Sequence, residues 1–184
     1  MNSDRLRELF SGGATFEELL ARPKKNKELW AVVYHRAALA PEAVARAALS
    51  SGVWHLLVLS EDWCGDSVNI LPVIARLTES MPLVDMRIVG RDDNPELMNK
   101  HLTGTSRSIP VVMVFDDTFT EREWWGPRPA PLQDWVIREG LALAKDERYR
   151  QVRMWYARDR GQTIVTELLQ IIERLEGRIA EASD

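Results

Sequence analysis

The chain has almost no cysteine and no long hydrophobic run. A single cysteine in 184 residues excludes an intramolecular disulfide, and a lone free thiol is typical of reducing compartments. The longest apolar runs, Leu56–Leu59 and Ile109–Phe115, are far too short to cross a bilayer. The opening segment, MNSDRLRELF, is charged and lacks the apolar stretch of a secretory signal. We therefore expect a cytoplasmic protein with no membrane partner.

The chain is also short of the positive charge that nucleic acid binding needs and of the clustered histidines that metal binding needs. Lysine and arginine together number 24 against 28 aspartates and glutamates, so the net charge is −4. This acidic balance argues against a nucleic acid partner. The three histidines, His35, His55 and His101, are scattered and give no metal-ligand spacing with the cysteine. Phosphate loops, dinucleotide fingerprints and hydrolase elbows do not occur, so we expect no metal and no cofactor.

What is present is the composition of a globular protein, with 45% hydrophobic and 28% charged residues. The first fifty residues have helical patterns: Thr15 and Glu18 form a capping box, Pro23 ends that helix, and Pro41 starts a later one. The expected elements are, in chain order, helix 26–38, helix 41–49, strand 54–59, helix 64–79, strand 83–89, helix 95–101, strand 111–115, strand 119–125 and helix 131–144. A crossover pair followed by a hairpin predicts an α/β fold with a mixed four-stranded sheet flanked by helices.

Residues 145–184 are expected to be helical again. An apolar stripe at helical spacing comprises Ile164, Leu168, Ile171, Ile172 and Leu175. The stripe has to be buried, either by packing back on the core, which we favour, or in a contact between two copies of a homodimer.

Residues 145–160, KDERYRQVRMWYARDR, combine basic and aromatic side chains. This combination occurs in segments that bind nucleic acid. It is more often a helix whose aromatic rings pack inward while its arginines extend to solvent, and we adopt that interpretation.

The candidate reactive residue is Cys64. It stands where a buried strand gives way to the first turn of a helix, between Trp63 and Gly65. Unpaired amide groups and the helix dipole favour a thiolate there, and the thiolate is the nucleophilic form. A lone cysteine is otherwise a small buried hydrophobic residue. Glycine leaves the backbone open at this point, which favours the reactive interpretation.

Residues 63–67, WCGDS, resemble the WCGPC motif of the thioredoxin superfamily. Residues 107–110, RSIP, resemble the R-x-I-P segment of that family, whose proline is cis. Residues 93–95, DNP, and Gly126 match two further features of the family in the same order. The match covers about residues 52–143. The chain resembles bacterial thioredoxin-like proteins that carry a WCGD motif and helical extensions.

The resemblance implies where the functional residues lie. Cys64 and Ser67 would take part in the chemistry, with Pro110 beside the sulfur. The surface that contacts a substrate would consist of Trp63, Gly65, Asp66, Ile109 and Pro110. The free backbone of Ile109 would then pair with an extended peptide or a small thiol.

Two departures from the family motif exclude the family's usual reaction. Thioredoxins use a second cysteine to release their product, and Ser67 occupies its position here. Serine cannot resolve a mixed disulfide, although its hydroxyl can donate a hydrogen bond to a thiolate at Cys64. The buried family aspartate six residues before the first cysteine is replaced by Val58. Because that aspartate serves the resolving cysteine, it has no use in a chain without one, so the absence of both is consistent. Reduction of a disulfide by a dithiol mechanism is therefore not expected.

Residues 125–129, WGPRP, lack the Gly-Gly…Asp signature of glutaredoxins that use glutathione. This weakens a role specific to glutathione, although Arg107 or Arg128 could pair with the carboxylates of a thiol cofactor.

Asp66 opposes the helix dipole at Cys64. A carboxylate ~6 Å from the sulfur costs the thiolate about 2–3 kcal/mol at an effective dielectric of ~20. The helix terminus stabilises the thiolate by up to ~2 kcal/mol. Since the two effects nearly cancel, we predict that the pKa of Cys64 lies modestly below that of free cysteine.

Two functional hypotheses follow from these residues. In the first, Cys64 forms a mixed disulfide with a low-molecular-weight thiol or a protein cysteine, and an external thiol releases it. In the second, the chain is a redox-inactive binding or adaptor module that holds a partner between Cys64 and Pro110. An exposed sulfur near Pro110 would favour the first, and a buried sulfur the second. We expect one domain over 1–184, with helical extensions over 1–51 and 144–184 around a core over 52–143.

Overall fold

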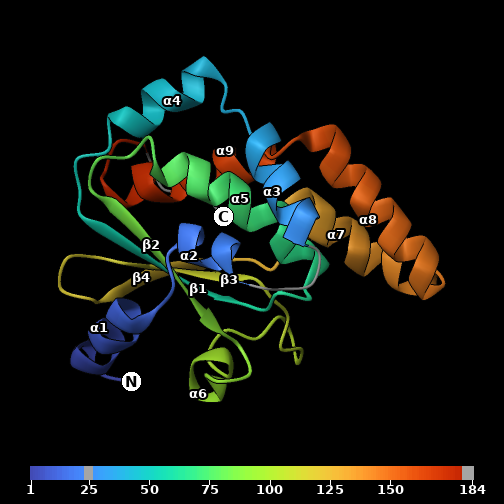
Figure 1. The fold of residues 1–184 in the computed structure, drawn as a ribbon, viewed down its shortest axis with the longest axis horizontal. Coiled ribbons are helices and arrows are strands. Elements are labelled where there is room, and N and C mark those ends of the chain that lie inside the picture. The colour runs from blue at the N-terminus through green and yellow to red at the C-terminus, as the bar shows by residue number, and fades with distance from the viewer. Residues whose placement is uncertain (23–26, 180–184) are drawn as a thin grey trace.

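The computed structural model describes residues 1–22 and 27–179, as nine labelled helices around one sheet (Figure 1). The helices are α1 (Ser3–Gly12), α2 (Phe16–Ala21), α3 (Lys27–Arg36), α4 (Pro41–Ala48), α5 (Gly65–Thr78), α6 (Pro95–Met98), α7 (Ala130–Arg138), α8 (Lys145–Asp159) and α9 (Gln162–Leu175). The strands are β1 (Trp54–Ser60), β2 (Val84–Gly90), β3 (Val111–Phe115) and β4 (Glu121–Trp125).

The four strands form one mixed sheet in the order β2-β1-β3-β4. Strand β1 pairs in parallel with β2, to which it is connected through α5, and β3 runs antiparallel to both β1 and β4. This is the crossover pair joined to a hairpin that the sequence predicts. The α/β class with a mixed, helix-flanked sheet is confirmed.

Both faces of the sheet are covered, so the central strands are buried on both sides. Along β1, Leu56 and Val58 point into a larger core, and Leu57 and Leu59 point into a smaller one. Helices α3, α5, α8 and α9 contribute to the larger core, and α1 and α6 cover the opposite face (Figure 1). Because each face buries apolar side chains, β1 has a continuous apolar sequence instead of an alternating one.

Most predicted boundaries agree with the structure to within two residues, but two predicted helices end earlier than expected. The helix expected over 95–101 ends at Met98, and the helix expected over 131–144 ends at Arg138 and is followed by a short 3-10 helix, Gly140–Ala142. The β3–β4 connection differs from the prediction by a smaller amount. Strand β4 begins at Glu121, two residues later than predicted, because the turn is longer than the sequence indicates. The Asp116 carboxylate accepts hydrogen bonds from the amides of Thr118 and Thr120, both at 3.0 Å. Phe119 between them has a positive φ of 60° and a buried ring. The predicted helix stop at Pro23 lies outside the described residues.

The helical stretch expected after residue 144 consists of two helices, α8 and α9. Arg160 and Gly161 both adopt left-handed backbone angles, with φ of 55° and 83°, and this turn separates α8 from α9. A Cβ at Gly161 would lie 2.7 Å from a methyl carbon of Val73 on α5. The turn therefore requires glycine both for its conformation and for its close approach to α5.

The apolar stripe of α9 packs on the core, as expected. Four of its residues belong to the larger core and the fifth packs at the edge: Ile164, Leu168, Ile171, Ile172 and Leu175. The alternative, burial in a dimer, is not needed to cover them. In α8 the expectation holds only in part, since Tyr156 is buried but Tyr149 is exposed.

Glu176, directly after α9, attaches the end of the chain to the segment before β1. One of its carboxylate oxygens accepts hydrogen bonds from the Ser50 hydroxyl (2.8 Å), the amides of Ser51 (3.1 Å) and Gly52 (2.8 Å), and the Trp54 indole (3.1 Å). Burial raises the pKa of Glu176, but these donors outweigh it, and the pKa is lowered. The contacts connect segments more than 120 residues apart.

We predict that Glu176→Ala lowers the free energy of unfolding by about 2–3 kcal/mol, because it leaves several donors unpaired in a partly buried site. Since the folded pKa of Glu176 lies below its unfolded value, its contribution is present above about pH 4.5 and is lost as the pH falls. Urea denaturation at pH 7 and pH 4 measures both effects. The exposed Glu139→Ala is the control. Equal losses for the two variants would contradict the assignment.

Candidate functional site

Cys64 is the N-cap residue of α5, directly beyond the turn that follows β1. Its side chain does not cap the helix. Its thiol instead donates to the carbonyl oxygen of Ile109, with sulfur and oxygen 3.4 Å apart. The residue is 7% exposed and belongs to the smaller core. The sulfur therefore lies at the expected helix terminus and beside the expected proline segment, but it is largely covered.

The Ile109–Pro110 segment faces the sulfur, and Gly126 packs closely against its backbone. The Ile109–Pro110 peptide bond is cis, and β3 starts at the next residue. Gly126, directly after β4, has φ of 131°, and a Cβ there would lie 2.3 Å from the carbonyl oxygen of Pro110. Only glycine allows the two backbones to approach this closely. The Gly126 match noted in the sequence thus has a steric cause.

Ser67 lies one helical turn after Cys64 and is completely buried. Within the described residues, its hydroxyl oxygen has no hydrogen-bond partner. The hydroxyl nevertheless lies close enough to Cys64 to lower the pKa of the thiol, although the two groups do not reach hydrogen-bond geometry. A buried hydroxyl without a partner is rare, and this one lies next to the sulfur of Cys64, the only cysteine in the chain.

The predicted lowering of the Cys64 pKa is wrong. Burial of the thiol raises its pKa, and the negative charge of Asp66 adds to that increase. The Ser67 hydroxyl and the amides of Ser67 and Asp66 act in the opposite direction without compensating fully. The sequence argument weighed the helix terminus against Asp66 and omitted desolvation, which is the largest effect for a thiol that is this deeply covered.

Asp66 is turned inward instead of facing a substrate. It is 7% exposed, and each carboxylate oxygen has a partner from a distant segment. One oxygen lies 2.6 Å from the Arg128 guanidinium, and the other accepts a hydrogen bond of 2.9 Å from the Tyr156 hydroxyl. Arg128 also donates to Gln133 at 3.0 Å. This cluster, Asp66 with Arg128 and Tyr156, joins the first turn of α5 to the loop after β4 and to α8.

The cluster changes the ionisation of its members. Burial alone lowers the pKa of Arg128, but the Asp66 carboxylate outweighs it and the pKa is raised. Burial and the same carboxylate raise the pKa of Tyr156 well above its ordinary value. Arg128 is therefore committed to Asp66, so its expected pairing with the carboxylates of a thiol cofactor is not available in this arrangement.

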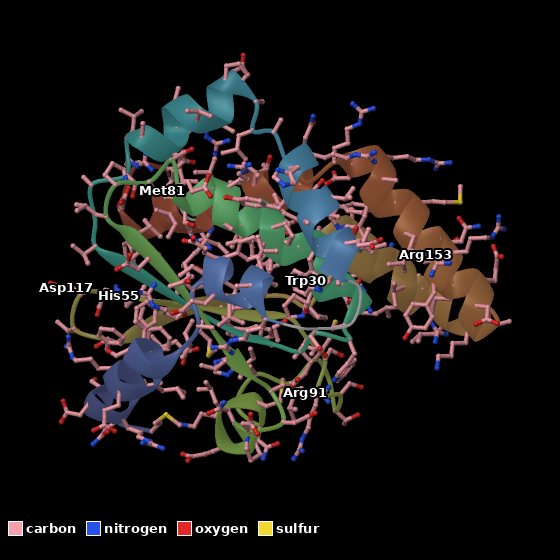
Figure 2. The ribbon with its side chains drawn as sticks, in the orientation of Figure 1. Trp30, His55, Met81, Arg91, Asp117 and Arg153 are labelled. Atoms are coloured by element: carbon pink, nitrogen blue, oxygen red, sulfur yellow. The ribbon has the colours of Figure 1, made fainter. Side chains whose placement is uncertain are left out.

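Trp63 forms the exposed edge of the site. Its side chain is 46% exposed, and the Arg91 guanidinium lies 4.9 Å above its ring (Figure 2 labels Arg91). Arg91 also donates to the carbonyl of Arg107 at 3.2 Å, which ties the ring to the segment before Pro110. Gly65 is exposed, and a Cβ there would meet no atom within 4 Å. This leaves the start of α5 open on one side.

A model of a family described as thioredoxin matches residues 13–151. The chain belongs to the thioredoxin family. The match includes β1, the cysteine-bearing turn, the Pro110 segment and β4, together with α8 as far as Gln151. Within this thioredoxin-family chain, six of the seven predicted site residues gather at one end of β1 and β3: Trp63, Cys64, Gly65, Ser67, Ile109 and Pro110. The Asp66 side chain points away from this group and toward α8, where it contacts Tyr156.

Comparisons with known proteins extend the likeness to most of the chain. A crystal structure of PA1234, a protein of unknown function from Pseudomonas aeruginosa, is 21% identical with a TM-score of 0.75, over 92% of this chain and 97% of that one. An HIV epitope-scaffold is 19% identical with a TM-score of 0.71, over 91% and 96%. No curated protein matches. At these identities the likeness shows the fold, helical extensions included.

The described residues of this thioredoxin-family chain contain no cluster of three metal-ligating side chains. The buried His101 has other partners, the Leu97 carbonyl at 2.8 Å and the Glu121 carboxylate at 2.6 Å. Across residues 1–22 and 27–179, no helix has the length and apolar character needed to cross a membrane.

We predict that Arg128→Ala is strongly destabilising, because it leaves the Asp66 carboxylate buried without its cation. The expected loss is about 3–5 kcal/mol of unfolding free energy in urea denaturation. The double variant Asp66→Leu with Arg128→Met should lose less than Arg128→Ala alone, since it removes both charges. Strictly additive losses from the two positions would contradict a direct pairing.

Proposed function

We propose that this chain carries out monothiol thiol–disulfide exchange through Cys64. The observation that carries the proposal is the surroundings of the sulfur: it sits at the N terminus of α5, against the Ile109 carbonyl, with the unpartnered Ser67 hydroxyl one turn away. Amide dipoles at a helix N terminus stabilise a thiolate. The buried serine hydroxyl offers a donor that no other described group uses.

The exchange proceeds in two steps that need no net oxidant. The Cys64 thiolate attacks one sulfur of a disulfide, a mixed disulfide with Cys64 forms, and the other sulfur leaves as a thiolate that takes up a proton from solvent. An external thiolate then attacks the mixed disulfide and forms a new disulfide with the bound group. The Cys64 thiolate is released and regains its proton. Because Ser67 has no sulfur, the second step depends on a thiol from outside the chain.

Ser67 assists by accommodating charge on the Cys64 sulfur. In the resting thiol, the Ser67 hydroxyl is buried and has no hydrogen-bond partner among residues 1–22 and 27–179. When the sulfur is a thiolate, a small rotation lets the hydroxyl donate to it, so the desolvation that raises the pKa of Cys64 is partly offset. The serine would thus serve as a positioning and charge-stabilising residue in place of a resolving cysteine.

The partner we propose is a low-molecular-weight thiol or an exposed protein cysteine in the cytoplasm. Trp63 and the open backbone at Gly65 provide an exposed edge beside the sulfur for either. We also propose that residues 1–184 act as one domain, since α9 contributes to the same core as β1.

The pH dependence of Cys64 alkylation follows from the raised pKa of its thiol. Only the thiolate reacts, so we expect the rate with iodoacetamide to increase through pH 9, where free cysteine is already mostly ionised. Ser67→Ala removes a group that lowers this pKa, so alkylation at pH 8 should slow by about threefold. A plateau below pH 8 in the unaltered chain would contradict this prediction.

The second candidate function is a redox-inactive binding module, and the burial of Cys64 is the observation that favours it. With 7% of the residue exposed, a disulfide reaches the sulfur only if the Pro110 segment or Trp63 moves slightly. A partner could instead be held against Trp63 without any covalent step. The two candidates differ in one measurable property, which is whether Cys64 exchanges disulfides while the chain is folded.

Intact mass spectrometry separates the two functions. After incubation of the folded chain with glutathione disulfide, we expect one added glutathionyl group, which a second thiol removes. In the Ser67→Cys variant the new thiol should resolve the adduct, leaving a protein that has lost two hydrogens. Cys64→Ser is the matched blank. A folded chain that stays unmodified, but reacts after unfolding in guanidinium, would overturn the exchange and favour the binding module.

A further inference from the structure

A concave site lies between α3, α5 and α8, and neither Trp63 nor Cys64 lines it. We call it the α3–α8 groove; its volume is about 640 Å³. The face of α3 toward it carries Leu29, Val32, Val33 and Arg36, at helical spacings of three and four. Val73 of α5 contributes to its apolar lining. Leu29 and Val32 are 44% and 41% exposed, so the groove presents apolar surface to solvent.

The α8 wall of the groove has the same spacing and adds positive charge. It consists of Arg153, Tyr156, Ala157 and Arg160 (Figure 2 labels Arg153). With Arg36 on the opposite wall, three arginines line the groove and no acidic residue does. None of the three has an ion-pair partner within the described residues. This is unusual in a chain whose net charge is −4.

Favourable helix electrostatics explain only part of this charge. Arg36 is the last residue of α3, and Arg160 directly follows α8, so each cation faces the negative end of a helix dipole. Arg153 lies in the middle of α8, where the helix termini have little effect. On the groove-facing side of α8, its guanidinium is available to an anion in the groove.

We propose that the α3–α8 groove binds a small amphipathic anion, namely an acyl chain that ends in a carboxylate. The apolar wall of α3 and Val73 would contact the chain. Arg153 and its two neighbouring arginines would bind the carboxylate, for which the guanidinium fork is well suited. The volume is typical of sites for small molecules. Two exposed large apolar side chains, Leu29 and Val32, are too few to form the centre of a protein–protein interface.

The groove and the Cys64 site share one residue. The Tyr156 ring lines the groove, while its hydroxyl donates to Asp66 in the first turn of α5. Binding in the groove goes beyond the exchange proposed for Cys64 and does not depend on it, so either proposal can fail alone.

Calorimetric titration of the full chain with octanoate, decanoate and dodecanoate, each below its micelle concentration, tests the proposal. We expect the dissociation constant to fall by roughly fourfold for each added methylene that is buried. Dodecyltrimethylammonium, which has the same chain and the opposite charge, should bind at least about tenfold more weakly. Equal affinity for the two head groups, or no dependence on chain length, would overturn the proposal.

Variants of α8 provide a matched pair. Arg153→Glu should weaken dodecanoate binding by about fivefold, whereas Arg158→Glu should change it by less than about twofold. Arg158 is an exposed residue of the same helix that does not line the groove. Both positions are exposed, so circular dichroism should show unchanged folding. Equal effects of the two variants would overturn the site. So would sedimentation showing that Arg153→Glu dissociates a dimer, because the occupant would then be a second copy.

Discussion

The buried pairing of Asp66 with Arg128 is the interaction on which the arrangement of the site depends. A carboxylate in the first turn of α5 is stable there only because a guanidinium and a tyrosine hydroxyl reach it from the loop after β4 and from α8. Removing a buried charge from water is costly unless its partner is in place. The first turn of α5, and with it Cys64, is therefore positioned by parts of the chain beyond the sheet. Helix α8 lies outside the sheet, but through Tyr156 it is part of the site.

The same burial determines what the thiol can do. A helix N terminus alone would favour the thiolate, but a sulfur packed into the smaller core is desolvated, and its pKa rises. At neutral pH the resting state is then a protonated thiol bonded to the Ile109 carbonyl. Burial protects such a cysteine from oxidation, and the exchange proposed for it would require a partner that opens its surroundings. This property suits a chain that has no second cysteine to reverse an unwanted adduct.

The sequence predicted local features well and distant contacts poorly. The Thr15–Glu18 capping box, the strands and the α9 stripe each depend on neighbouring residues, and the structure contains all three. The turn at Phe119 and the break at Gly161 depend on single backbone conformations that periodicity does not reveal. The partners of Asp66 lie 62 and 90 residues away, so no local pattern could identify them. Nor could it show how deeply Cys64 is covered, which decided its pKa.

The long separation of Asp66 from its partners has a consequence for biosynthesis. As the chain emerges from the ribosome, α5 appears before Arg128 and Tyr156 do. At that stage the Asp66 carboxylate still requires hydration, so the first turn of α5 cannot be buried. Arg128 and then Tyr156 follow much later, so the Asp66 carboxylate has both of its buried partners only after residue 156 has been translated. Until then the first turn of α5 lacks the two long-range contacts that hold it in place in the folded chain.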